Sequence, residues 1–233
     1  MDVVLIAGLW LPDSVWSDVV VELRDLGHRA IPVSLPGVDE KPSAATLEDQ
    51  LVAALQVIDA AHRPLVVGHS AACSLAWLVA DRRPDSLAGV ALIGGFPASD
   101  GSVYADFFPI VDGVMAFPGW EPFEGPDSAD LDEDQKAALA ELAVPVPAGV
   151  ASGVVHLGDE RRFAVPVVLV CPEFSEAQAR EWLNEGEVPE LERAAKIEYV
   201  DIDSGHWPMV TQPHELARRL AATAETLGGD AQR

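Results

Sequence analysis

The sequence predicts an α/β protein whose mostly parallel sheet has about six strands, with helices on both faces and one helical insertion. Short apolar runs alternate with amphipathic stretches of helical period, which is the pattern of buried parallel strands joined by crossover helices. The chain has 233 residues, enough for one α/β domain with a sizeable core.

The first part of the chain supplies four strands and the helices between them. The strands are expected at residues 2–7, 28–35, 64–68 and 88–95. Ser14 is placed to cap a first helix, which Gly27 ends, and a capping-box sequence that starts at Thr46 opens the second. A third helix is expected from Ala71 to about Arg82, because the stretch between them is apolar with helical period.

The regular alternation breaks over residues 96–160. This segment is rich in aromatic residues, proline and glycine, and it contains one acidic amphipathic stretch at about residues 129–142. It leaves the sheet at the carboxyl end of a strand, where functional groups of parallel sheets gather. We therefore expect a core of residues 1–95 and 161–233, with 96–160 inserted as a helical cap.

Regular elements return after the insertion. Strands are expected at residues 166–171 and 196–202, with a helix at 175–184 between them. A last helix begins at Pro213, since proline is favoured at the first helical position, and Gly228-Gly229 is expected to end it. These elements complete the predicted sheet.

The composition is acidic, with a formal net charge of −23. A charge of this sign repels nucleic-acid phosphates and anionic membrane surfaces, so neither is expected as a partner. The sequence shows no apolar run of membrane-spanning length and no signal-peptide pattern, and both cysteines lie in apolar runs. These features favour a cytoplasmic protein. Metal-binding and phosphate-binding motifs are also missing, so we expect no metal and no cofactor.

The turn after the third strand offers a candidate nucleophile, Ser70. The residues Gly68-His69-Ser70-Ala71-Ala72 follow an apolar strand and precede a helix, as in the G-x-S-x-G turn that lifts a serine hydroxyl above a sheet. Ala72 stands where the second glycine belongs, and alanine is small enough for close packing there. The alternative interpretation is an ordinary strand–helix turn with a serine near the helix start.

His206 is the candidate base for this serine. A serine hydroxyl needs a group that accepts its proton, and histidine is the usual choice at neutral pH. His206 follows the last predicted strand, so it falls at the same edge of the sheet as Ser70. The backbone N–H groups of Leu9 and Ala71 are the expected oxyanion hole.

Four stretches of the sequence resemble the α/β-hydrolase superfamily, and within it the small methylesterase-like and hydroxynitrile-lyase-like proteins. They are VVLIAGLWLPDSVW, LVVGHSAACSLAWLVA, PVVLVCPEF and IDSGHWPMVTQPHELARRL, and the resemblance extends over nearly the whole chain. It implies an α/β-hydrolase fold in which Ser70 is the nucleophile, His206 the base and 96–160 a helical cap. The implied substrate is a small or medium carboxylic ester with an apolar part.

The sequence departs from the superfamily pattern at two further positions. The first loop begins with Ala7-Gly8 in place of His-Gly, and Phe174 stands where the catalytic aspartate is expected. Glu173 is adjacent and long enough to reach His206, so we expect it to be the acid. Asp100, which follows the fourth predicted strand, is the alternative, and a missing acid is the third possibility.

The expected activity is that of a serine hydrolase cleaving a small-molecule carboxylic ester through an acyl-enzyme on Ser70. The alternatives are a lyase or a non-hydrolytic ligand-binding protein with a degenerate triad, and, with less support, an acidic protein-interaction module. We expect an apolar pocket lined mainly by aromatic side chains, some of which can instead form the core of the insertion. Its predicted lining is Trp10, His69, Phe96, Phe107, Phe108, Phe117, Trp120 and Trp207.

Overall fold

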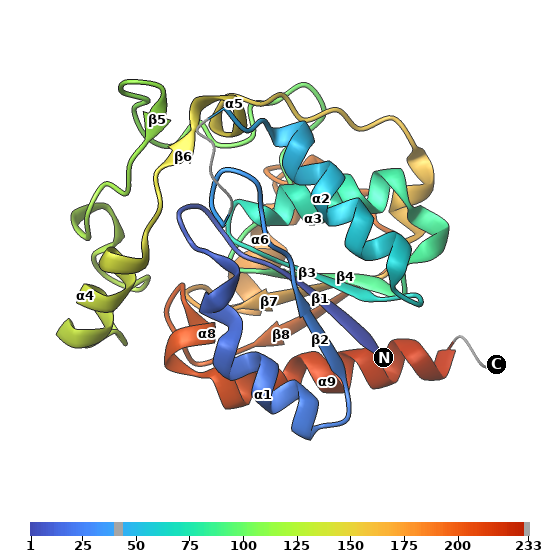
Figure 1. Ribbon diagram of the computed structural model, residues 1–233. Coiled ribbons are helices and arrows are strands. Elements are labelled where there is room, and N and C mark those ends of the chain that lie inside the picture. The colour runs from blue at the N-terminus through green and yellow to red at the C-terminus, as the bar shows by residue number, and fades with distance from the viewer. Residues whose placement is uncertain (40–43, 231–233) are drawn as a thin grey trace.

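The main sheet is parallel and central. The computed structural model describes residues 1–39 and 44–230. In this part of the chain the main sheet has six strands in the order β2-β1-β3-β4-β7-β8 (Figure 1). Each strand overlaps the stretch predicted for it. Their bounds are β1 Asp2–Ile6, β2 Arg29–Pro32, β3 Leu65–His69, β4 Gly89–Ile93, β7 Val167–Cys171 and β8 Ile197–Asp201.

Strand β2, at one edge of the sheet, is shorter than the predicted 28–35. It ends at Pro32, although the Val33 N–H still donates to the Leu5 carbonyl at 2.9 Å. The chain then turns away from the sheet through a turn in which Val38 N–H donates to the Leu35 carbonyl at 3.1 Å.

Helices cover both faces of the sheet (Figure 1). Helices α1 (Ser17–Asp25) and α9 (Pro213–Asp230) pack on one face, and α2 (Leu47–Ala60) and α3 (Ala72–Arg82) pack on the other. Two clusters of buried apolar side chains fill the space between the sheet and these layers. In the described ranges, no helix combines the length and apolarity needed to cross a bilayer.

The local signals in the sequence explain where the first helices begin. The Thr46 Oγ1 accepts from the Asp49 N–H at 3.2 Å and the Asp49 carboxylate accepts from the Thr46 N–H at 2.9 Å, which completes the predicted capping box of α2. The helix predicted from Ser14 opens as a 3₁₀ turn over Asp13–Trp16 and continues as α1. Gly27 follows with a φ of 84°, a conformation that favours glycine.

The predicted end of the last helix is wrong. Helix α9 continues through Gly228 and Gly229 to Asp230. A glycine in a helix costs only about 1 kcal/mol relative to alanine. Leu227, which is 7% exposed, anchors the helix directly before the two glycines. The glycines therefore extend a helix that is already anchored, at a cost too small to end it.

Three further helices complete the second half of the core. Helix α6 (Glu176–Asn184) lies where it was predicted. The sequence did not predict α7 (Pro189–Glu192) or α8 (Pro208–Thr211), because four residues are too few to show a helical period. Helix α8 directly follows the loop that carries His206.

Residues 96–160, called the insertion below, connect β4 to the second half of the core, and Val150, Val155 and Leu157 near their end pack in the same apolar cluster as α2 and α3. The insertion contains the two-stranded sheet of β5 (Val114–Met115) and β6 (Val146–Pro147), helix α4 (Glu133–Leu142) and the short helix α5 (Ala148–Ala151). In Figure 1, α4, β5 and β6 lie to one side of the main sheet. Helix α4 starts later than the predicted 129–142, because Asp132 forms its capping box with Gln135.

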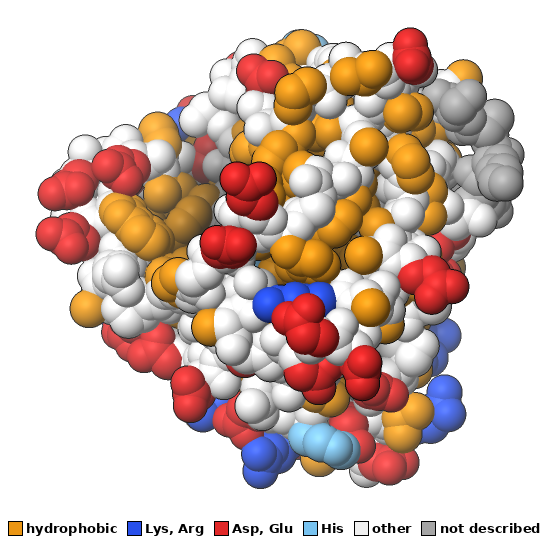
Figure 2. Space-filling model, turned by 90° about the vertical axis from the view of Figure 1, so that its left-hand side faces the viewer, with side chains coloured by type: hydrophobic (Ala, Val, Ile, Leu, Met, Phe, Trp, Pro, Cys, Tyr) orange, Lys and Arg blue, Asp and Glu red, His pale blue; other side chains and the backbone are white. Residues whose placement is uncertain are grey.

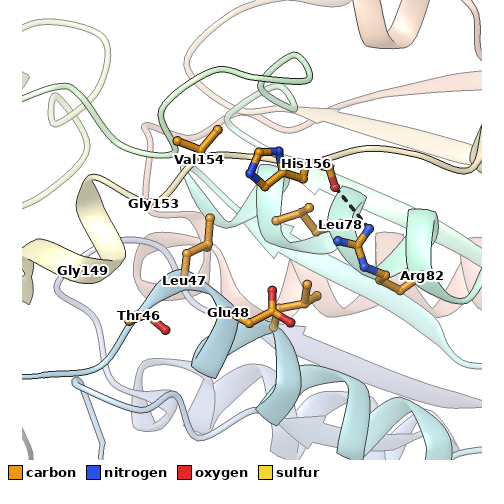
Figure 3. Close-up of a pocket in the computed structure, with 10 residues that line it drawn as sticks. Thr46, Leu47, Glu48, Leu78, Arg82, Gly149, Gly153, Val154 and His156 are labelled. Atoms are coloured by element: carbon orange, nitrogen blue, oxygen red, sulfur yellow. Dashed lines mark hydrogen bonds between the residues drawn. The ribbon is translucent and has the colours of Figure 1, made fainter.

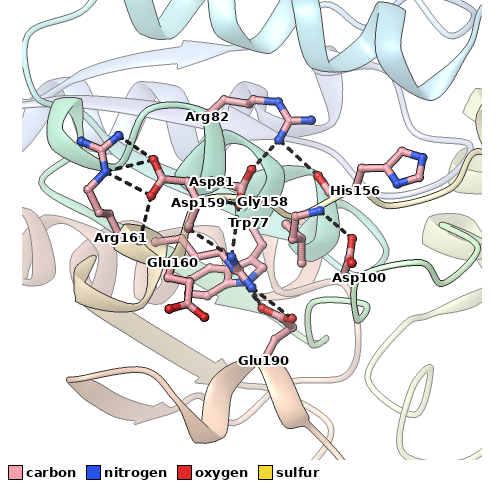
Figure 4. A network of polar contacts seen from close by, with 12 residues as sticks. Trp77, Asp81, Arg82, Asp100, His156, Gly158, Asp159, Glu160, Arg161 and Glu190 are labelled. Carbon is pink, nitrogen blue, oxygen red and sulfur yellow. Dashed lines mark hydrogen bonds and ion pairs between the residues drawn. The ribbon is translucent and has the colours of Figure 1, made fainter.

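The insertion returns to the core through a buried ionic network (Figure 4). Arg162, with a side chain that is 5% exposed, donates to Glu190 Oε2 at 3.0 Å and to Asp81 Oδ1 at 3.2 Å. Trp77 Nε1 also donates to Glu190, at 3.0 Å. These contacts join α3 and α7 to Arg162, just beyond the insertion. The N–H groups of Gly158 and Asp159 also donate to Asp81 Oδ1, at 2.9 and 2.8 Å, so the end of the insertion is fixed to α3 at this point.

Candidate active site

Ser70 lies in a strained turn between β3 and α3. Its φ of 56° is in the left-handed region, which residues other than glycine rarely adopt. Its N–H donates to the Ile93 carbonyl of β4 at 2.8 Å, and this bond holds the turn against the neighbouring strand. The turn therefore has the geometry of a nucleophile elbow.

The residues around the turn are small because there is no space for larger side chains. A Cβ on Gly68 would overlap the Ala72 carbonyl and would lie 2.8 Å from its carbon. A Cβ on Gly95 would lie 2.7 Å from the Ser70 carbonyl oxygen. Sequence reasoning missed the role of Gly95, although the pair Gly94-Gly95 at the end of the predicted strand 88–95 was visible. Ala72 itself is fully buried, so its methyl group fits where a glycine was expected.

His206 and Glu173 form a hydrogen-bonded pair. Glu173 follows β7, His206 follows β8, and His206 Nδ1 lies 2.8 Å from Glu173 Oε1. Both side chains are 14% exposed. Gly94 (φ 58°) lies beside the pair, since a Cβ there would be 3.2 Å from His206 Nδ1 and from Glu173 Oε2. The structure thus places a carboxylate at the ring nitrogen where a triad acid acts.

Asp100, the alternative acid, lies elsewhere. Its Oδ1 accepts a hydrogen bond from the Leu157 N–H at 2.9 Å, beside the ionic network at the end of the insertion (Figure 4). Phe174 stacks on Phe96 with ring centroids 5.5 Å apart, and Trp182 of α6 packs against both. An aromatic cluster therefore occupies the position at which the sequence pattern expects an aspartate.

His69 connects the turn of Ser70 with the loop of His206. Its Nε2 donates to the His206 carbonyl at 2.7 Å, and the two rings lie 4.9 Å apart. Burial, together with the charge on His206, lowers the pKa of His69 to about 3, so its ring is neutral at physiological pH. Its other nitrogen, Nδ1, is buried without a hydrogen-bond partner among the described residues.

A third acid, Asp127 of the insertion, lies close to the pair. Burial raises the pKa of this carboxyl group, the charge on His206 lowers it, and repulsion from Glu173 raises it further. The sequence gives no signal for this contact, because 46 or more residues of chain separate Asp127 from both partners. In the described part of the chain, no group of three or more His, Cys, Asp or Glu side chains is arranged to hold a metal ion.

The loop after β1 lies directly against Ser70. A Cβ on Gly8 would be 3.1 Å from Ser70 Cβ and 2.8 Å from His69 Nδ1, so this approach requires glycine. Within the described residues, the N–H groups of Leu9 and Ala71 donate to no other protein group. Both are therefore free to donate to a ligand oxygen.

Aromatic residues of the insertion pack over this loop. Trp10 Nε1 donates to the Met115 carbonyl at 3.1 Å, and the Val144 N–H donates to the Trp10 carbonyl at 2.8 Å. The Trp10 ring contacts Phe108 and Phe117 at centroid distances of 5.7 and 5.5 Å. The insertion thus holds the loop after β1 through both the backbone and the side chain of Trp10.

The same cluster reaches the residue after His206. Trp120 contacts Trp207 with centroids 5.2 Å apart, and Phe123 contacts both Trp207 and Trp10. Phe107 stays outside the cluster and is 62% exposed. Some predicted pocket residues therefore pack on one another, as a core of the insertion would, while Phe96 belongs to the cluster around Phe174.

The face beyond the strand ends is apolar with an acidic surround (Figure 2). Hydrophobic side chains gather over its middle, and most charged side chains around them are Asp and Glu. A cavity of about 210 Å³ lies elsewhere, between α2, α3 and residues 149–156, with Arg82 and His156 beside it (Figure 3). None of the predicted site residues lines that cavity, so we give it no part in the site.

Comparisons with known proteins agree with this architecture. A sequence model described as "Alpha/beta hydrolase family" matches residues 3–219. A comparison with curated protein sequences gives no match. Among solved structures, an extracellular alpha/beta-hydrolase from a Paenibacillus species, described as sharing structural and functional homology with tobacco salicylic acid binding protein 2, is similar. It is 19% identical with a TM-score of 0.78, over 95% of this chain and 98% of that chain.

Two plant structures are also similar. A methylesterase from Arabidopsis is 14% identical with a TM-score of 0.77, over 97% of this chain and 99% of that chain. Tomato methylketone synthase I is 17% identical with a TM-score of 0.73, over 97% of this chain and 98% of that chain. At these identities the likeness shows the shared fold.

Proposed function

Because the chain belongs to the alpha/beta hydrolase family, we propose that it is a serine hydrolase that cleaves a small or medium apolar carboxylic ester. The observation that carries the proposal is the His206–Glu173 pair, which lies beside a strained Ser70 turn and is joined to it through His69. An orienting carboxylate, an imidazole and a serine on a sharp turn are the parts that acyl transfer requires.

The proposed mechanism assigns a role to each of these groups. His206 Nε2, the ring nitrogen that does not face Glu173, takes the proton from Ser70 Oγ while the oxygen attacks the ester carbonyl carbon. The N–H groups of Leu9 and Ala71 stabilise the oxyanion. His206 then gives the proton to the leaving alcohol, and an acyl-enzyme remains on Ser70. Water, activated by His206, releases the carboxylic acid and restores the serine.

Glu173 has an orienting and electrostatic role in this mechanism. Its Oε1 accepts the Nδ1 proton of His206, which fixes the ring tautomer with Nε2 free to act as a base. Its negative charge also stabilises the imidazolium that forms when His206 holds the serine proton. A glutamate therefore replaces the expected aspartate, with the longer side chain making up for a position one residue earlier.

The proposed substrate is an ester with an apolar part. The aromatic side chains of the insertion and the apolar face of Figure 2 favour such a molecule over a strongly charged one. The name of the Arabidopsis structure, a methylesterase, agrees with ester cleavage. In this proposal the insertion, 96–160, serves as the cap over a core of 1–95 and 161–233.

A lyase or other non-hydrolytic activity is the second candidate. One structure of the same fold is named a synthase, so the fold alone leaves the reaction class open. The departures at Ala7 and Phe174 also favour this candidate. The two candidates differ in whether an acyl-enzyme forms on Ser70 and is then hydrolysed by water.

Turnover of p-nitrophenyl esters of increasing chain length tests the proposal. Wild type is expected to release p-nitrophenol catalytically, and Ser70→Ala and His206→Ala are each expected to lose this activity at unchanged thermal stability. Absence of turnover across the panel, or full activity of Ser70→Ala, would rule out the serine mechanism and favour the second candidate.

A further inference from the structure

The backbone of His206 is held from two sides. Its N–H donates to the Asp127 carbonyl at 2.7 Å, and its carbonyl accepts from His69 Nε2 at 2.7 Å. His69 belongs to the turn of the proposed nucleophile, whereas Asp127 belongs to the insertion. The proposed base is therefore clamped between the core and the insertion.

The residues just before His206 make a second contact with the insertion. Asp130 Oδ2 accepts from the Gly205 N–H at 2.8 Å and from Ser204 Oγ at 3.2 Å. Ser204 Oγ also lies 3.0 Å from Thr211 Oγ1 of α8. One carboxylate of the insertion thus binds two consecutive residues of the loop that carries the base.

Gly205 permits this contact. A Cβ at this position would overlap the Asp127 carbonyl oxygen and the Asp130 carboxylate, and would lie 3.0 Å from the Asp127 carbonyl carbon. Its φ is not positive, so space, rather than backbone conformation, is the reason for glycine here. The turn at 127–130 and the loop at 204–206 therefore lie too close together for a side chain at position 205.

The insertion segment that makes these contacts is itself anchored. Leu131 follows Asp130 and is 5% exposed in the same core cluster as Trp207 and Met209. Its N–H donates to the Ser128 carbonyl at 3.2 Å, which closes a turn around Asp130. The Asp130 carboxylate therefore lies on a turn of the insertion that is itself held in place.

We propose that Asp130 is a positioning residue for His206, through which the insertion sets the direction of the catalytic base; this inference rests on the proposed function. Glu173 fixes the rotation of the imidazole ring, while the backbone of residues 204–206 fixes the position of the His206 Cα from which the ring extends. Both are needed to bring Nε2 to the serine hydroxyl, and a displacement of about 1 Å at a reacting group can lower a rate by about 100-fold.

The decisive variants are Asp130→Ala, Asp130→Asn and the control Asp132→Ala. Asparagine retains an oxygen that can accept from the Gly205 N–H, whereas alanine removes the acceptor. Asp132 is two residues away and caps α4, where its carboxylate accepts from the Gln135 N–H at 2.8 Å. Among the hydrogen bonds of the described residues, those that join 130–132 to the 204–206 loop come from Asp130. Asp132→Ala therefore measures the effect of removing a carboxylate from the same segment without removing a contact to the loop of His206.

The readouts are kcat and KM with the p-nitrophenyl ester that wild type hydrolyses best, and the rate at which a fluorophosphonate labels Ser70. Asp130→Ala is expected to lower kcat and the labelling rate about tenfold and to change KM by less than about twofold, because the base is displaced while the aromatic side chains proposed to contact the substrate remain. Asp130→Asn is expected to recover most of the rate, and Asp132→Ala to keep it.

Equal effects of Asp130→Ala and Asp132→Ala, or an Asp130→Asn variant as slow as Asp130→Ala, would overturn the positioning role. Thermal unfolding is measured for each variant. Should Asp130→Ala unfold at the assay temperature, Ser204→Ala removes a donor from the other side of the contact, and an unchanged kcat there would equally overturn it.

Ser70→Ala, run in parallel, separates this inference from the proposed function. Activity that survives in Ser70→Ala refutes the serine mechanism itself. An inactive Ser70→Ala together with a fully active Asp130→Ala leaves the proposed function standing and refutes only the role of Asp130.

Discussion

Glu173 Oε1 lies 2.8 Å from His206 Nδ1, although the resemblance to other α/β-hydrolases places the acid one residue later, at Phe174. The longer glutamate side chain reaches the histidine from the earlier position. Phe174 is then free to pack against Phe96 and Trp182. An exchange of this kind retains a carboxylate beside the histidine and adds an aromatic cluster next to it.

Glu173→Gln is expected to lower kcat by at least about 100-fold with little change in KM, because it retains the shape and loses the charge that stabilises the imidazolium. Steady-state kinetics with a p-nitrophenyl ester measures this effect. Asp100→Asn is the matched control, since Asp100 bonds to the Leu157 N–H and not to His206. A larger loss in Asp100→Asn than in Glu173→Gln would move the acid to Asp100.

Gly68→Ala is expected to lose activity and to destabilise the fold by about 1–3 kcal/mol, because the added Cβ overpacks the elbow. That Cβ would lie 2.8 Å from the Ala72 carbonyl carbon. Gly158→Ala is the control, since nothing lies within 4 Å of a Cβ there. Urea unfolding and ester turnover measure the two effects, and equal behaviour of the variants would contradict a space requirement at the elbow.

Folding stability is expected to fall below pH 6.5 because of His69. The folded-state pKa of this histidine is lowered to about 3, while the unfolded value is 6.5, so the unfolded chain binds the proton more tightly. The stability that depends on neutral His69 is present above pH 6.5 and declines as the pH falls toward 3. Between pH 7 and pH 5 the free energy of unfolding should drop by about 2 kcal/mol from this group.

Urea unfolding at pH 7 and pH 5 measures this dependence. His69→Gln retains a side-chain N–H for the His206 carbonyl and has no titratable ring, so its stability should depend less on pH over this range. An identical pH slope in wild type and His69→Gln would show that His69 is not the group responsible.

Arg162→Met is expected to lower the free energy of unfolding by about 3–5 kcal/mol, because it leaves buried carboxylates without their cation. The affected partners are Asp81 and Glu190. The neighbouring Arg161 pairs with Asp85 and Asp159 on the surface, so Arg161→Met should change stability only slightly. Equal losses in the two variants would show that the buried network contributes no more to stability than the surface pairs of Arg161.

The sheet and the elbow were predictable because their signals are local. Continuous apolar runs such as 64–68 and 166–171 specify buried strands, and the spacing around Ser70 specifies a turn. Helix α9 shows the limit of such signals, since two glycines suggested an end and the helix nevertheless continues through both to Asp230. Local propensity is weak compared with burial of an apolar face.

The support around the site could not be read from the sequence. The contacts of Asp127 and Asp130 with residues 204–206 join segments that are 74 or more residues apart. They also use backbone groups, which every residue possesses. Glu173 was a candidate because it is adjacent to the position at which the resemblance places the acid, whereas these contacts depend on how the insertion folds back over that edge.

Labelling with a fluorophosphonate, followed by mass spectrometry of the digested protein, tests the central claim most directly. The account predicts one phosphonyl group, located on the peptide that contains Ser70, with no labelling of Ser70→Ala and slower labelling of His206→Ala. No adduct on wild type, or an adduct on another residue that persists in Ser70→Ala, would contradict the assignment of Ser70 as the nucleophile.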